Sequence, residues 1–127
     1  MVKENRTIGI SKSIEDGEEG CLTVDIYQTD EDIVIKSTIA GVRPDDLDIS
    51  VSNDSVTIKG TRRQEEKIDA DNYYYQELHW GSFSRSVLLP EDIDPDLAKA
   101  SLVNGVLTLR LPKMSYKKVK KIKVLEK

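Results

Sequence analysis

The segment from Ser101 to Lys113, SLVNGVLTLRLPK, contains the strongest conformational constraint in the chain. The Asn-Gly pair at 104–105 is typical of a two-residue type I′ β-hairpin loop, in which both loop positions need a positive φ. A loop of this length sets the register of the two strands that flank it. The expected cross-strand pairs are Val103–Val106, Leu102–Leu107 and Ala100–Leu109.

Because side chains alternate along a strand, this hairpin has one apolar and one polar face. One buried and one solvated face is typical of an antiparallel sheet. We expect Pro112 to end the second strand, since proline donates no backbone hydrogen bond. The apolar face is expected to hold Ala100, Leu102, Leu107, Leu109 and Leu111, and the polar face Lys99, Ser101, Thr108 and Arg110.

Several other short segments have β-type composition and are separated by turn signals. The residues at 91–100 predict only a turn or a short helical turn. Short strands at this spacing, without a long amphipathic helix, predict an all-β fold: an antiparallel, immunoglobulin-like β-sandwich. The strand-like segments are CLTVDIYQTD at 21–30, DIVIKSTI at 32–39, DLDISVS at 46–52, VTIKG at 56–60, YYYQELHW at 73–80 and SFSRSVLLP at 82–90.

Length and composition limit the classes of protein to consider. A chain of 127 residues predicts one domain, with an N-terminal arm at 1–20, a sandwich at 21–113 and a C-terminal extension at 114–127. The net charge of −4 argues against a general nucleic-acid binder. We expect a cytoplasmic protein, because the sequence shows neither a signal peptide nor an apolar run of about 20 residues that could span a membrane.

The sequence contains no constellation of residues that predicts catalysis. It has one histidine, His79, and one cysteine, Cys21, which are too few ligands for a typical zinc site and too far apart in sequence to suggest a nucleophilic pair. No glycine-rich loop precedes a Lys-Ser/Thr pair, so ATP hydrolysis is unsupported. We therefore expect no enzyme activity, no cofactor and no metal.

Two motifs resemble those of a known family. The segment ASLVNGVLTLRLPK is similar to the A-x-x-x-N-G-V-L signature of the α-crystallin domain of small heat-shock proteins, and QELHWGSFSRSVLLP resembles their E-R-x-x-G-x-F-x-R-x-x-x-L-P stretch. The resemblance covers about residues 21–113 and indicates the bacterial and archaeal type; Leu78 stands where the family often has arginine. The matching residues are Ala100, Asn104, Gly105, Val106 and Leu107 in the first motif, and Glu77, Gly81, Phe83, Arg85, Leu89 and Pro90 in the second.

The resemblance implies a chaperone that acts without ATP. Such proteins hold partly unfolded client proteins in solution through binding rather than chemistry. Ile122 and Val124 in the C-terminal extension resemble the family's I-x-I/V motif, whose two side chains enter an apolar groove of a neighbouring subunit. The residues expected to line that groove are Leu47, Ile49 and Val51 on one wall and Ala100 and Leu102 on the other.

The resemblance also implies self-association. The charged stretch TRRQEEKIDADN and the tyrosines after it match the place where relatives exchange a strand between partners. We therefore expect a strand-swapped homodimer and a larger homo-oligomer, without nucleic acid or membrane as partner. The residues assigned to the dimer interface are Tyr73, Tyr74, Tyr75, Glu77 and Arg85.

The sequence leaves three alternatives open. The same sandwich occurs in binding adaptors and co-chaperones without holdase activity, although these normally lack both the exchanged loop and the I-x-I/V motif. Another alternative is a shortened assembly component that dimerises but protects nothing. The N-terminal arm, which is about 20 residues long and has no aromatic residue, is shorter and less apolar than is usual in the family. An enzyme is disfavoured by the absence of a catalytic constellation.

Overall fold

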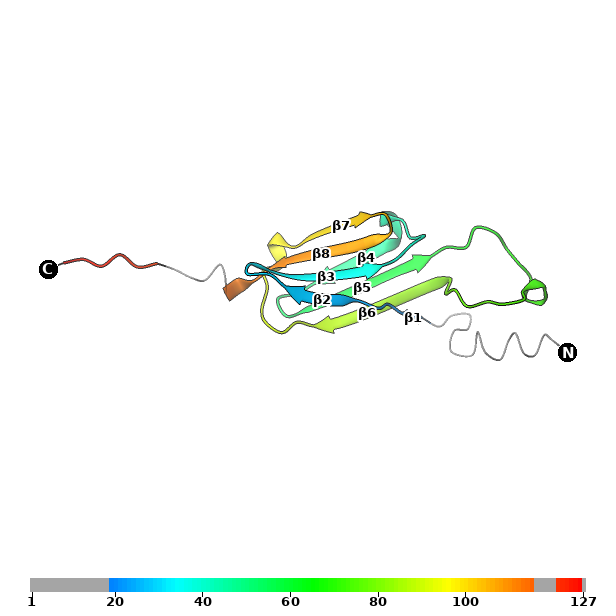
Figure 1. The fold of residues 1–127 in the computed structure, drawn as a ribbon, viewed down its shortest axis with the longest axis horizontal. Helices are drawn as coiled ribbons and strands as arrows, with labels where there is room; N and C mark the ends of the chain where they lie inside the picture. The colour runs from blue at the N-terminus through cyan, green and yellow to red at the C-terminus, as the bar shows by residue number, and fades with distance from the viewer. Residues whose placement is uncertain (1–18, 116–120, 127) are drawn as a thin grey trace.

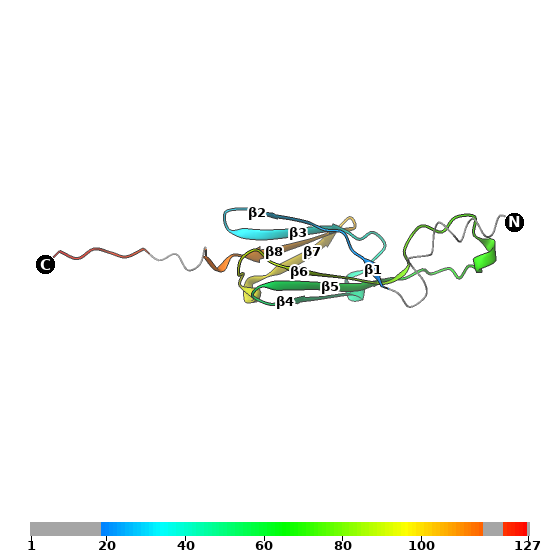
Figure 2. The same ribbon diagram turned by 90° about the horizontal axis from the view of Figure 1, so that it is seen from below.

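A computed structural model describes residues 19–115 and 121–126 of the chain. Within these residues the fold is a β-sandwich of two four-stranded sheets, seen as two layers in Figure 2. The predicted all-β fold class is therefore confirmed. Figure 1 shows the strands running along the long axis of the molecule, with the loop between β5 and β6 extending beyond one end.

The first sheet, sheet A, has the strand order β1-β6-β5-β4. Strands β4, β5 and β6 are antiparallel neighbours, whereas β1 pairs with β6 in parallel. The strands are β1 (Gly20–Cys21), β4 (Leu47–Val51), β5 (Ser55–Arg62) and β6 (Gly81–Leu88).

The second sheet, sheet B, has the order β2-β3-β8-β7 and is antiparallel throughout. Short 3-10 helices lie in three connections, and the third of them confirms the short helical turn expected between residues 91 and 100. The strands are β2 (Asp25–Gln28), β3 (Asp32–Thr38), β7 (Lys99–Val103) and β8 (Val106–Pro112), and the helices are η1 (Pro44–Asp46), η2 (Ala70–Asn72) and η3 (Pro95–Leu97).

The β7–β8 hairpin has the register expected from its loop. Asn104 and Gly105 have φ values of 52° and 79°, as a type I′ turn requires. The backbone N–H of Ile39 donates to the carbonyl oxygen of Gly105 at 2.7 Å, which attaches the turn to the residue following β3. All three expected pairs are present: Val103–Val106, Leu102–Leu107 and Ala100–Leu109.

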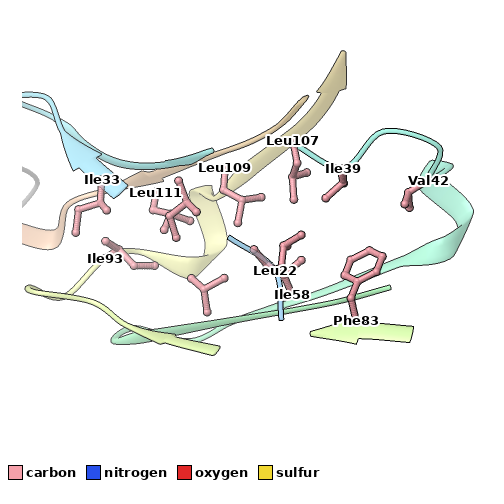
Figure 3. Close-up of a cluster of buried hydrophobic side chains, with 12 residues drawn as sticks. Leu22, Ile33, Ile39, Val42, Ile58, Phe83, Ile93, Leu107, Leu109 and Leu111 are labelled. Atoms are coloured by element: carbon pink, nitrogen blue, oxygen red, sulfur yellow. The ribbon is translucent and has the colours of Figure 1, made fainter. Parts of the chain in front are cut away.

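The core lies between the inward faces of the two sheets, as Figure 3 shows. Strand β8 contributes Leu107, Leu109 and Leu111, all almost completely buried, so its predicted apolar face is confirmed. Ala100, expected on that same face, stays exposed because β7 is the edge strand of sheet B. The buried cluster consists of Leu22, Ile33, Ile35, Ile39, Val42, Val56, Ile58, Phe83, Ile93, Leu107, Leu109 and Leu111.

The segment 21–30 differs from the sequence-based expectation of a single strand. The chain pairs with sheet A at β1, leaves it at Leu22 and pairs with sheet B only from Asp25, so the prediction of one continuous strand is wrong. Arg85 stabilises this crossing, because its Nη1 donates to the carbonyl oxygen of Leu22 at 2.8 Å. Alternating side chains cannot reveal that a segment changes sheets, since the alternation continues through the crossing.

Gly60 is required by the close approach of an aromatic ring. Gly60 and Phe83 are register partners on β5 and β6, and a Cβ atom at position 60 would lie 2.5 Å from Cζ of Phe83 and 3.0 Å from the carbonyl oxygen of Asp46. Phe83 is 3% exposed and belongs to the core cluster. A side chain at position 60 would therefore displace a core residue.

We predict that Gly60→Ala lowers the free energy of unfolding by about 1–3 kcal/mol, the usual cost of overpacking. Phe83→Leu removes the clashing ring atom. Gly60→Ala should therefore lower the free energy of unfolding clearly less in the Phe83→Leu variant than in the parent chain. Urea unfolding of the four proteins measures this coupling. Equal costs in the two backgrounds would contradict this explanation of Gly60.

Candidate binding groove and self-association surfaces

An apolar groove of about 340 Å³ lies between the edge strand of each sheet. Strand β4 provides one wall and strand β7 the other, while side chains of β8 that belong to the core close its base. Lys99 is the only charged residue in the lining, so the groove favours an apolar occupant. The lining residues are Ile49, Val51, Pro95, Ala98, Lys99, Ala100, Leu109 and Leu111.

Three of the five residues expected in this groove line it: Ile49, Val51 and Ala100. Leu47 and Leu102 are half-buried and pack against the core. Leu47 also borders a second hollow of about 350 Å³, whose lining includes several charged side chains of η1, β4 and β5. Leu47 and Leu102, one at the end of each predicted wall, therefore do not line the apolar groove.

Sequence reasoning missed five lining residues: Pro95, Ala98, Lys99, Leu109 and Leu111. The two leucines were assigned to the same sheet face as Ala100, so their alternation already carried the signal. Pro95 and Ala98 lie in and just after η3, and no pattern in the sequence indicated that this turn borders the groove.

Both residues of the C-terminal extension that were expected to dock in a groove are exposed to solvent. Ile122 is 82% exposed and Val124 is 90% exposed, and residues 121–126 form no helix or strand. In Figure 1 the tail segment 121–126 lies beyond one end of the sandwich. Within a single chain, therefore, these two side chains are not in the groove.

The tyrosine segment forms no strand within its own chain. Tyr74 and Tyr75 are 80% and 76% exposed, and they lie in the loop that leads from η2 to β6. Tyr73 is half-buried, and its hydroxyl accepts a hydrogen bond from Nε2 of Gln64 at 3.0 Å. Glu77 is exposed. Figures 1 and 2 both show the loop extending away from the sandwich.

Arg62 joins the two ends of this loop. Its Nε donates to the carbonyl oxygen of Ala40 at 2.8 Å, and its Nη1 donates to that of His79 at 3.0 Å. His79, the one histidine, packs its ring against Gly20 of β1 and contacts the carbonyl oxygen of Ser82 through Nε2. These contacts indicate a structural role for His79 at the base of the loop.

The described residues show neither a metal site nor a membrane-spanning helix. No group of three or more His, Cys, Asp or Glu side chains there has a geometry that could hold a metal ion. No helix in the described part of the chain is long and apolar enough to cross a membrane.

Comparison with known proteins places this fold and these motifs in one family. The family model of the Hsp20/alpha crystallin family matches residues 18–125. The chain is 37% identical over 100 residues to spore protein SP21 of Stigmatella aurantiaca, covering 79% of this chain and 59% of that protein. It is 36% identical over 108 residues to a 17.8 kDa class I heat shock protein of Arabidopsis thaliana, covering 82% and 69%.

Solved structures of two relatives have the same fold. Heat shock protein 16.0 from Schizosaccharomyces pombe superposes with a TM-score of 0.69 at 27% identity, covering 85% of this chain and all of that chain. A small heat-shock protein from Xylella fastidiosa also has a TM-score of 0.69, at 28% identity, and covers 86% of this chain and all of that one.

The matching regions account for only part of several relatives. The chain spans 59%, 65% and 61% of the lengths of spore protein SP21 and of two Rickettsia felis small heat shock proteins. The family match nevertheless extends over most of the present chain, from the start of the described sandwich into the C-terminal extension. The chain belongs to the Hsp20/alpha-crystallin family.

Proposed function

We propose that this protein is an ATP-independent holdase, a chaperone that binds partly unfolded proteins and prevents their aggregation. The observation that carries the proposal is the family match over residues 18–125. The names of several relatives, among them small heat shock protein C2 of Rickettsia felis, support a role in the heat-shock response.

The surfaces of the sandwich are suited to this role. Unfolding proteins expose apolar side chains and unpaired strand edges, which drive their aggregation. The β4–β7 groove offers apolar surface. Within residues 19–115 and 121–126, β2 pairs only with β3, so its other edge is open in that part of the chain. Covering a client's exposed surface needs binding energy rather than a reaction, so the proposed function requires no nucleotide.

A binding adaptor or co-chaperone without holdase activity is the alternative. The long exposed tyrosine loop and the Ile122/Val124 pair are features of an assembling protein and favour the holdase. The two functions differ in one measurable property, since an adaptor of this kind does not keep an unfolding client in solution by itself.

We predict that the protein suppresses aggregation of a heat-unfolding client in the absence of nucleotide. At one subunit per client molecule, light scattering should fall by more than half, and Mg-ATP should not change the result. A non-chaperone protein at equal mass concentration is the control. Suppression that needs ATP, or no suppression with any of several clients, would show that the holdase proposal is wrong.

We propose that the segment Tyr73–Glu77 of each subunit adds to the β2 edge of a partner, giving a strand-swapped homodimer. Tyr74, Tyr75 and Glu77 are exposed, the segment forms no strand, and all four residues of β2 are exposed at the edge of sheet B. Arg85 would lie near this seam, because it binds the crossing that leads into β2. Backbone hydrogen bonds would supply the affinity, as in other cases of strand addition.

We predict that proline within this segment weakens the dimer. Proline removes a backbone donor, and donors point alternately toward and away from a neighbouring strand, so Tyr74→Pro and Tyr75→Pro should be tested in parallel. In at least one variant the dimer dissociation constant should rise about tenfold or more, which corresponds to about 1.4 kcal/mol. Glu66→Pro, in the same loop but outside the segment, is the matched control.

Analytical ultracentrifugation over a dilution series measures the dissociation constants. Because the segment makes no strand pairing in its own chain, the fold of the subunit should be unchanged, which circular dichroism can verify. If both tyrosine variants dimerise as tightly as the parent and the control, strand exchange through this segment does not hold the dimer together.

We propose that assembly beyond the dimer depends on docking of Ile122 and Val124 in the β4–β7 groove of a neighbouring subunit. In an extended segment, residues i and i+2 point the same way, so both side chains can enter one groove. Burial of each is worth about 1.5–3 kcal/mol before ordering costs are subtracted. A single link is weak, but links repeated around a closed assembly reinforce one another.

We predict that Ile122→Ala combined with Val124→Ala removes species larger than the dimer and leaves a folded dimer. Leu125→Ala is the matched control, because Leu125 is also exposed in the tail but points to the opposite side of an extended segment. Multi-angle light scattering across a wide concentration range measures the mass. The same mass distribution in the double variant and the parent would overturn tail docking.

A further inference from the structure

Lys113, at the root of the C-terminal extension, is a buried lysine in a highly charged protein. It directly follows Pro112, the last residue of β8, and is 8% exposed. Its Nζ donates to Oε1 of Gln28 at 2.6 Å and lies 3.8 Å from Oε2 of Glu91. The ammonium group therefore bridges the end of β2 and the connection between β6 and η3.

The residues next to Lys113 are held by the same two parts of the fold. The backbone N–H of Lys113 donates to the carbonyl oxygen of Glu31 at 2.8 Å, in the β2–β3 turn. The N–H of Met114 donates to the carbonyl oxygen of Asp92 at 3.0 Å, and the hydroxyl of Ser115 donates to Oε1 of Glu91 at 2.9 Å. The extension is thus held from two sides where it leaves the sandwich.

Stability alone does not explain an ammonium at this position. Removing a charge from water is costly, and a well-packed apolar side chain of similar size often serves stability equally well. Among the described residues, the one ion pair of the Lys113 ammonium is with Glu91, at a distance longer than an ordinary hydrogen bond. A methionine could fill the space of the aliphatic stem, but it could not bridge Gln28 and Glu91.

We propose that Lys113 is a positioning residue that sets the direction in which the C-terminal extension leaves the sandwich. The bridge ties that direction to Gln28, the last residue of the strand whose open edge is the proposed site of strand exchange. Direction determines which neighbouring groove the tail can reach, so Lys113 also controls the size distribution of the assembly. This second consequence rests on the tail docking proposed above, whereas the positioning role does not.

The test measures the spread of tail directions by spin labelling. Cys21 is exposed and is the only cysteine, so it takes one label, and Lys117→Cys provides the second, two residues after Ser115. Labelled subunits are diluted with unlabelled protein, and the distance distribution is measured in the background Ile122→Ala with Val124→Ala, so that docking does not restrain the tail. The distribution should be narrow in this background.

Lys113→Met should increase the width of the label-to-label distance distribution at least twofold. Lys59→Met is the matched change at an exposed lysine of β5 and should leave the width of that distribution unchanged. Gln28→Leu removes the 2.6 Å acceptor at an exposed position and should widen it as well, which keeps the test valid if Lys113→Met fails to fold. A distribution already broad before Lys113 is changed, or one that Gln28→Leu leaves narrow, would overturn the proposal.

With the tail intact, Lys113→Met should shift the mass distribution, whereas Lys59→Met should not. The two proposals fail in different ways. If the double change at Ile122 and Val124 leaves the mass unaltered while Lys113→Met still widens the distance distribution, tail docking is wrong and the positioning role stands. If the double change removes the large species while the width does not respond to Lys113→Met or to Gln28→Leu, the positioning role is wrong and docking stands.

Discussion

The register of β8 against its neighbours is the constraint on which the rest of the sandwich depends. A slip of one residue would turn every side chain of the strand to the opposite face. The positive φ angles of Asn104 and Gly105 fix that register on the β7 side, and the turn is also bonded to Ile39. As a result, Leu109 and Leu111 have two roles, since they fill the core and also form the base of the groove.

Local signals in the sequence were sufficient to predict the strands that are flanked by a characteristic turn sequence or that show clear alternation of apolar and polar residues. The β7–β8 hairpin was predicted to the residue, and in β3 the burial of Ile33 and Ile35 follows the alternation. Val34 is completely buried as well, on the other face of β3, where it is flanked by its register neighbours Tyr27 and Arg110. Long side chains of adjacent strands can cover an outward-facing valine, and alternation does not reveal this.

Features that depend on contacts between distant parts of the chain were harder to predict from the sequence. The passage from β1 to β2 is stabilised by Arg85, which lies more than sixty residues further on, and the contribution of η3 to the groove depends on how two sheet edges meet. Ile49, Val51 and Ala100 could be assigned to the groove only through resemblance to a family. The tyrosine segment has β-type composition but forms no strand within its own chain, so its composition alone did not predict its structure in the single subunit.

The distribution of charge adds a long-range component to the proposed assembly. From Lys113 to Lys127 the chain has seven lysines and one glutamate, although the whole protein carries a net charge of −4, so the rest of the chain is strongly acidic. A basic extension is attracted to an acidic subunit over a distance of about 8 Å at physiological salt. Such attraction mainly raises the rate of encounter, whereas the tight apolar contact determines how long a link persists. Charge would therefore bring a tail to a neighbouring subunit, and the fit of Ile122 and Val124 would select the groove.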